Sequence, residues 1–342
     1  MKTFRYAQGL WAGLALITMI VSVAWWSDRF LALGVYGIGT LSIALMIGMV
    51  LGNAIRLPSS LRPGIHFAQQ KLLRAGVMLF GLHVSIGQLL HVGWQALGID
   101  LIVMATILIG GIWLGIHIFG MQRDLAVMTA VGSAICGAAA ILATEPVVRG
   151  SSAHTSMAVA SVVLFGTLAI LIYPIIYHLS GGDPGVFGIY VGATVHEVAQ
   201  VVAVGHSIGD GAEQTAVIVK LMRVLLLAPV LLLLGLWWRK TGDVTGHAKA
   251  RLAIPWFAFG FVGVVILNSI WPAPPNLHQQ LLGFDTLLLA AAMAALGLET
   301  RFDRLRELGL KPLMFAGVLF LVLMVGGDVL TQWMLQPPLQ LK

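Results

Sequence analysis

Four polar residues interrupt an apolar stretch near the middle of the chain, and they could bind an anion or move a proton. The stretch is Val186–Val204, and the four are Thr194, His196, Glu197 and Gln200. A carboxylate inside such a stretch is costly unless it is paired, so it is a functional candidate by default. His196 and Gln200 share one helical face, whereas Glu197 lies about 100° away. The string lacks the second histidine of the zinc-protease motif H-E-x-x-H, so we expect no metal here.

Two cations lie three residues apart in the next apolar stretch, Ala216–Trp238. They are Lys220 and Arg223. One interpretation is structural: either cation pairs with Glu197, or both extend to one membrane interface. The functional interpretation is an anion pocket whose charge is balanced by two titratable groups, Glu197 and His196.

Small residues interrupt a third apolar stretch, Ala126–Ala143, around Gly132, Ser133, Cys136 and Gly137. Two glycines weaken a helix, and the alanines that follow favour its restart. A restarted helix presents free backbone N–H groups and a positive dipole end, which together attract anions. The alternative is close helix packing through small residues.

Two further carboxylates lie near the ends of apolar stretches. Glu145 precedes Pro146, and Asp285 lies just ahead of a repeated segment. Each could be a surface group or part of a proton pathway. The substrate-binding candidates are therefore Gly132, Ser133, Cys136, Gly137, Thr194, His196, Gln200, Lys220 and Arg223, and the proton-relay candidates are Glu145, His196, Glu197 and Asp285.

These residues must be positioned by helices in a lipid bilayer. The chain has 342 residues, of which 58% are hydrophobic and 10% charged, and its mean hydropathy is +0.93. Soluble domains carry about 25% charged residues. Runs of about 20 apolar residues predict spanning helices, and they are too long for barrel strands. We predict an all-α membrane protein with eleven spans: Gly9–Trp26, Leu31–Gly52, Leu72–Leu90, Leu97–Phe119, Ala126–Ala143, Ser156–Tyr177, Val186–Val204, Ala216–Trp238, Ala253–Trp271, Leu281–Leu298 and Leu313–Leu335.

The distribution of Lys and Arg predicts the orientation. With eleven crossings, the basic loops fall on the cytoplasmic side, which places the N-terminus inside and the C-terminus in the periplasm. Arg149 is the main exception. The parity also holds if the fifth and seventh spans are re-entrant, which leaves nine crossings.

Internal repeats indicate how this single transmembrane domain, residues 1–342, is organised. At an offset of 216, four glycine pairs coincide: Gly81/Gly297, Gly93/Gly309, Gly110/Gly326 and Gly111/Gly327. These copies, about 41–119 and 257–335, would have opposite orientations, as in many secondary transporters. A weaker repeat, at an offset of 60, relates parts of the central segments 126–178 and 186–238. Similar composition explains the weaker one equally well.

Composition also excludes several classes of protein. The net charge of +6 is modest and is expected of basic loops, so we predict no nucleic-acid partner. The single cysteine, Cys136, excludes an intrachain disulfide. No phosphate-binding GxxxxGK[ST] loop is present, which argues against ATP-driven pumping. We expect no enzyme activity and no cofactor.

Four strings resemble the YeiH family of bacterial inner-membrane proteins: Leu45–Asn53, Ser133–Pro146, Tyr190–Ala203 and Phe284–Leu298. The resemblance covers nearly the whole chain. The family is labelled as sulfate exporters, which implies sulfate or a related sulfur oxyanion as substrate. The repeats and interrupted helices also suggest an architecture similar to bile-acid/sodium symporters and sodium/proton antiporters, an analogy that fixes no substrate.

The sequence thus predicts a secondary transporter of a small anion in the bacterial inner membrane, coupled to protons. The partners we expect are the bilayer, the anion, a proton or sodium ion and, as an option, a second copy of the chain. Three alternatives remain open: a sodium-coupled carrier of organic anions, an intramembrane enzyme that uses His196 and Glu197, and a membrane protein that transports nothing.

Overall fold

Helices make up nearly all of the described chain, and no strand occurs in it. The computed structural model describes residues 2–31, 39–55, 57–240, 255–271, 273–300 and 309–335. Six of its helices are long and apolar enough to cross a membrane, and a seventh if a bent pair is one span. The chain is therefore a helical multi-pass membrane protein, and the predicted count of eleven spans stays a prediction. Parts of two predicted spans (residues 32–38 and 253–254) and the loop cations Arg56, Lys249, Arg251, Arg301, Arg304 and Arg306 lie outside the described residues.

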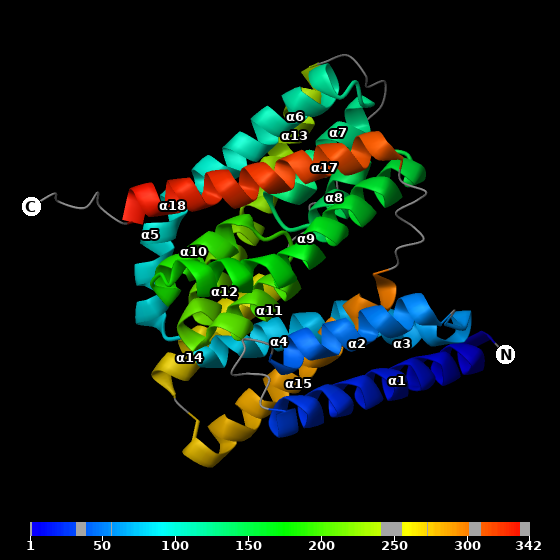
Figure 1. Cartoon of the computed structure of the whole chain (residues 1–342), viewed down its shortest axis with the longest axis vertical. Coiled ribbons are helices and arrows are strands. Elements are labelled where there is room, and N and C mark those ends of the chain that lie inside the picture. Colours follow the sequence, from blue (N-terminus) through cyan, green and yellow to red (C-terminus); the bar gives the residue numbers. More distant parts are fainter. Residues whose placement is uncertain are drawn as a thin grey trace, which may run out of the picture. The chain divides into compact units, whose positions relative to one another are not determined.

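The chain divides into two compact units. Unit 1 comprises Met1–Leu89, Val202–Asp210 and Trp256–Asp303, and unit 2 comprises Leu90–Val201, Gly211–Pro255 and Arg304–Lys342. Helices of unit 1 are α1 (Lys2–Leu31), α2 (Thr40–Ala54), a continuous run of η2 (Ser59–Leu61), α3 (Arg62–Phe67), η3 (Ala68–Leu72), α4 (Leu73–Leu79) and η4 (Phe80–His83), then α14 (Trp256–Ile270) and α15 (Pro275–Glu299). Within this unit, α2 packs along α15 (Figure 1).

The helices of unit 1 repeat at the offset of 216 that the glycines suggested. Adding 216 to the bounds of α2 gives those of α14, and adding it to the helical run Ser59–His83 gives those of α15. The contacts repeat as well. A side chain at Gly297 would meet the carbonyl oxygen of Leu45, and one at Gly81 would meet that of Phe261. The pair α2 and α15 therefore packs in the same way as the pair formed by α14 and the run Ser59–His83.

Unit 2 contains the interrupted helices. It holds most of α5 (Ile86–Ala105), then η5 (Thr106–Gly110), α6 (Gly111–Trp113), η6 (Leu114–Ile118), α7 (Arg123–Ala134), α8 (Ala138–Val148), α9 (Ser152–Ser180), α10 (Pro184–Thr194), the start of α11 (Val198–Ile208), nearly all of α12 (Asp210–Leu225), then α13 (Leu227–Lys240), α17 (Leu310–Leu321), η7 (Val322–Gly326) and α18 (Gly327–Leu335). The π-helical turns η5 and η7 also coincide at the offset of 216.

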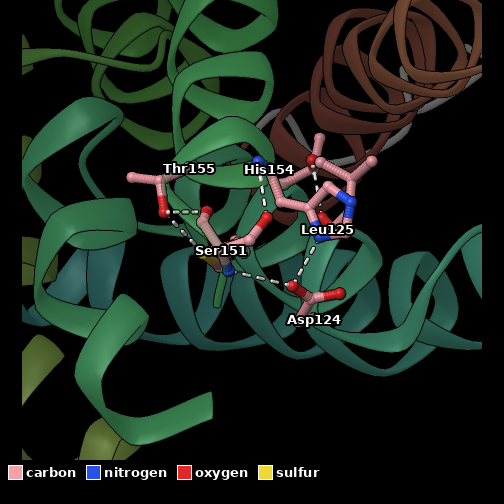
Figure 2. Close-up of polar contacts among 7 residues, drawn as sticks. Asp124, Leu125, Ser151, His154 and Thr155 are labelled. Atoms are coloured by element: carbon pink, nitrogen blue, oxygen red, sulfur yellow. Dashed lines mark hydrogen bonds and ion pairs between the residues drawn. The ribbon is translucent and has the colours of Figure 1, made fainter. Parts of the chain in front are cut away.

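Helices α7 and α8 form a hairpin rather than one broken rod (Figure 1). Near the tip, a side chain at Gly132 would meet Ile141, which lies on the other side of the break. At the open end, the Ser151 backbone N–H donates to Asp124 Oδ2 at 3.4 Å, and His154 Nδ1 lies 2.6 Å from the same oxygen (Figure 2). Both ends of the hairpin therefore lie together, on one side of the unit.

Helices α10 and α11 form a second hairpin. A side chain at Gly188 would meet Ala212, and one at Gly192, four residues later, would meet Ala216. Helices α10 and α12 thus run in the same direction, which requires α11 to return the chain between them. The bounds of α11 equal those of α8 plus 60, and the last residue of α10 equals that of α7 plus 60.

Predicted single spans therefore differ from the structure at three places. The stretches Ala126–Ala143 and Val186–Val204 fold as hairpins, one of the two options that the charge pattern left open. The stretch Leu72–Leu90 is not one straight helix, because the axis turns by 100° between His83 and Ile86. Val84 adopts an extended conformation there, which breaks the helical hydrogen bonding.

Candidate functional site

Lys220 joins the tips of the two hairpins. Its Nζ donates to the backbone carbonyls of Ile135 and Val195, each at 2.6 Å, and the side chain is 0% exposed. These carbonyls follow the last residues of α7 and α10, where helix dipoles place partial negative charge. An ammonium group has three N–H donors, so one donor remains for a further acceptor. The sequence predicted Lys220 at the site but not this bridge between two interrupted helices.

Glu197 reaches from the second tip to the first. Its Oε1 accepts a hydrogen bond at 3.1 Å from the backbone N–H of Ala138, the first residue of α8. Gly137 makes this approach possible, because a side chain there would overlap Glu197 Cγ. Its φ of 67° also favours glycine. The carboxylate therefore lies at the positive end of α8, where an anion would bind.

Gln200 and Thr194 hold the second tip in place. Gln200 Oε1 accepts from the Glu197 backbone N–H at 3.0 Å, inside the first turn of α11. Thr194 Oγ1 accepts from Tyr173 Oη at 2.9 Å and donates to the Tyr190 carbonyl at 2.6 Å. Both side chains are fully buried. They hold the backbone of the tip in its conformation, and their oxygen atoms already take part in hydrogen bonds within the protein.

Two tyrosines that the sequence did not single out support the same tip. Tyr173 of α9 and Tyr190 of α10 stack with their ring centroids 4.9 Å apart. Tyr190 Oη donates at 2.7 Å to the carbonyl of Met324, inside the π-helical turn η7. Such a turn leaves a helical carbonyl without its usual partner, so the tyrosine replaces the missing bond. No sequence pattern indicates this contact, because π-turns have no simple residue pattern.

Three predicted residues complete the tips: Ser133, Cys136 and His196. Ser133 Oγ and His196 Nδ1 are buried atoms with no hydrogen-bond partner among the residues that the structure describes. Their side chains are each 1% exposed, and that of Cys136 is 6% exposed. Native proteins rarely leave buried polar atoms unpaired. The two atoms are therefore available to a bound molecule.

Arg223 is paired, but not with the expected partner. Its guanidinium forms an ion pair with Asp100 of α5, with Nε 2.7 Å from Asp100 Oδ1. Arg223 is 0% exposed and Asp100 1% exposed, so neither side chain extends to an interface. Glu197 was named as a possible partner from the sequence, and Asp100 was not identified. A single aspartate inside the apolar stretch Leu97–Phe119 was the available signal.

The remaining two candidates lie away from the tips. Glu145 is in the last turns of α8, near the open end of its hairpin, and is partly buried. Asp285 belongs to α15 in unit 1, where its Oδ2 lies 3.6 Å from His83 Nδ1. Their predicted part in proton transfer remains a prediction. The structure brings the other ten candidates together in unit 2, with Arg223 one helical turn from Lys220 on α12.

Fold and site together define a helical multi-pass membrane protein with two hairpins whose tips meet at a buried lysine. The chain belongs to the family described as Conserved hypothetical protein 698, whose model matches residues 12–316. It is 44% identical over 322 residues to the UPF0324 inner membrane protein YeiH of Escherichia coli K12, which covers 93% of this chain and 92% of the relative. It is 43% identical over 341 residues to the UPF0324 membrane protein PA5383 of Pseudomonas aeruginosa, which covers 97% and 96%. No solved structure matches the chain. The resemblance to the YeiH family is thereby confirmed.

Proposed function

We propose that the chain is a secondary transporter that carries a small oxyanion, with sulfate or a related sulfur oxyanion as the leading candidate, across the bacterial inner membrane with protons. The observation that carries the proposal is the meeting of two interrupted helices at Lys220 and Glu197. Half-helices that point at a common centre are the binding sites of many secondary transporters.

Charge at the tips favours an anion. Each helix end carries about half an elementary charge, so the carbonyl ends of α7 and α10 together supply about one negative charge, which Lys220 offsets. The amino ends of α8 and α11 supply about one positive charge at the same place. Unpaired Ser133 Oγ and His196 Nδ1, with the third donor of Lys220, are groups that can bind an oxyanion.

The two repeats support a transporter architecture. If both hairpins are re-entrant, the helices related by the offset of 216 have opposite orientations, and so do the two hairpins related by the offset of 60. Both duplications then have the inverted symmetry of secondary transporters. Helices that end inside the membrane are tolerated where their ends are buried in protein, as the residues of the tips are.

Re-entrant hairpins also remove the main exception in the charge pattern. With nine crossings and a cytoplasmic N-terminus, the open end of the first hairpin lies in the cytoplasm, so Arg149 follows the positive-inside rule. Of the 20 Lys and Arg residues, only Arg29 and Lys342 then lie outside, with Lys220 and Arg223 inside the membrane. The C-terminus is periplasmic in this arrangement.

Labelled sulfate, sulfite and thiosulfate flux into vesicles that contain only the purified chain tests this function. We expect flux of at least one of these anions that rises with an inward proton gradient and needs no sodium. Sodium dependence would favour the organic-anion carrier. No flux of any anion at any pH would contradict a transport function.

A further inference from the structure

We infer that the Glu197 carboxylate is a built-in competitor of the substrate, so that the anion binds at the start of α8 only when Glu197 is protonated and has moved away. The inference rests on the proposed function and states how the same site is coupled to protons.

Position is the first argument. Glu197 Oε1 accepts from the Ala138 N–H, the first amide of α8, at 3.1 Å. The first amides of a helix have no partner within the helix, and an anion is their preferred ligand. A carboxylate oxygen and a substrate oxygen require the same N–H group, so the two cannot occupy it together.

Asymmetry between the tips is the second argument. At the offset of 60, the residue that corresponds to Glu197 is Gly137. The glutamate fills the space that this glycine leaves open, whereas the first tip has no carboxylate to offer in return. One tip therefore supplies the anion-binding helix end, and the other supplies the group that covers it.

Charge balance is the third argument. With Glu197 ionised, its charge offsets the two helix amino ends, as Lys220 offsets the two carbonyl ends. Protonation of Glu197 leaves about one uncompensated positive charge, which one negative charge on the substrate would neutralise. One proton should therefore enter with each anion that binds at the tips.

Among the ionisable groups at the tips, Glu197 is the one placed to take up a proton when the anion binds. Gln200 accepts from the backbone N–H of Glu197 and not from its carboxyl group. Glu197 is partly accessible, so a proton can reach the carboxylate. The charged or titratable groups that surround it at the tips are Lys220 and Arg223 of α12, Asp100 of α5, which pairs with Arg223, Cys136 of the first tip and the adjacent His196. Lys220 and Arg223 are each already bound to acceptors.

The two forms of the site exclude each other, which defines the transport cycle. One form holds an ionised Glu197 on α8 and no substrate, and the other holds a neutral Glu197 and the anion. If the site can change the side of the membrane to which it opens only in these two forms, anion and proton move together in the same direction. No bond other than that of the transferred proton is made or broken.

Binding and proton uptake of the detergent-purified chain test the inference, with sulfate and sulfite as probes from pH 5 to pH 9. Where Glu197 is ionised in the free protein, we expect the affinity to fall about tenfold per pH unit and about one proton to be taken up per anion in weak buffer. Glu197→Gln keeps an oxygen for the Ala138 N–H but no charge. We expect it to bind with an affinity that does not depend on pH and without proton uptake.

Asp183→Asn is the matched control, because it neutralises an exposed carboxylate at the open end of the same hairpin and still allows the N-cap bond to Val186. It should behave as the unmodified chain does. Anion binding to the unmodified chain with no pH dependence and no proton uptake would overturn the inference and leave transport standing. So would loss of anion binding in a folded Glu197→Gln variant at every pH. If the unmodified chain binds neither anion and transports none, the proposed function itself fails.

Discussion

The two hairpins share one backbone plan but carry different side chains. Their returning helices, α8 and α11, have equal lengths, and both begin after a three-residue break. The first tip has Cys136 and Gly137, where the second has His196 and Glu197. The common plan lets both tips meet Lys220, while the polar groups lie almost entirely on one of them. The comparison indicates that the first hairpin supplies backbone donors and space, and that the second supplies the titratable side chains.

Removal of Lys220 should have the largest effect, because both hairpins depend on it. Lys220→Met leaves the carbonyls of Ile135 and Val195 buried without a donor, and each unpaired group costs about 1–3 kcal/mol. We expect a strongly lowered melting temperature and anion flux reduced by about two orders of magnitude or more. Lys71→Met, at an exposed position of η3, should change neither. Flux near the unmodified value in Lys220→Met would show that the tips do not need their common cation.

The Asp100–Arg223 pair separates a structural from a binding function for Arg223. Either Arg223→Met or Asp100→Asn alone strands a buried charge, which costs about 3–5 kcal/mol. The double variant removes both charges, so we expect most of the stability to return. Its flux then decides the question: full flux makes Arg223 a structural residue, and stable protein without flux makes it part of the anion site.

Gly137 tests whether the first tip must leave room for the second. Gly137→Ala combines an unfavourable φ of 67° with overlap of the Glu197 side chain, and we expect a loss of about 3 kcal/mol. Gly181→Ala is the matched control. It has a similar φ of 63° but no neighbouring atom within 4 Å, so strain alone should cost about 1 kcal/mol. Equal melting temperatures of the two variants would exclude the close approach of Glu197 to Gly137.

Labelling from each side of the membrane should distinguish the two hairpins. Cys136→Ala removes the only cysteine of the chain, and exposed positions at the two open ends can then carry a new one. An impermeant thiol reagent should reach Ser152→Cys only from the cytoplasm and Gly182→Cys only from the periplasm. Labelling of both from the same side would contradict hairpins that enter from opposite faces.

Local interruptions of helices could be predicted from the sequence, but their tertiary consequences could not. Gly132 and Gly137 mark the first break, and the polar run from Thr194 to Gln200 marks the second. A break, however, is compatible with either a kinked crossing or a hairpin. The contact of Ser151 with Asp124, 27 residues apart, settles the choice, and no local pattern encodes it.

Partners across the fold were missed for a similar reason. Asp100 and Arg223 are separated by 123 positions, and the charge of an aspartate does not reveal which helix it faces. The repeat at an offset of 216 was visible because paired glycines lie at equivalent positions of the related helices, and two of the pairs, Gly81/Gly297 and Gly111/Gly327, lie where helices pack closely. The offset of 60 was weak in sequence because the two tips have diverged in chemistry while their helix bounds still coincide.

The most direct test of an anion at the tips uses the native cysteine. Cys136 is the only cysteine in the chain and lies at the first tip, so the alkylation rate of the unmodified protein reports on that position alone. Saturation with the transported anion at low pH should slow alkylation of Cys136 several-fold, and Lys220→Met should abolish this protection. A rate that is unchanged by an anion which the same vesicles transport would contradict a binding site at the meeting of the hairpins.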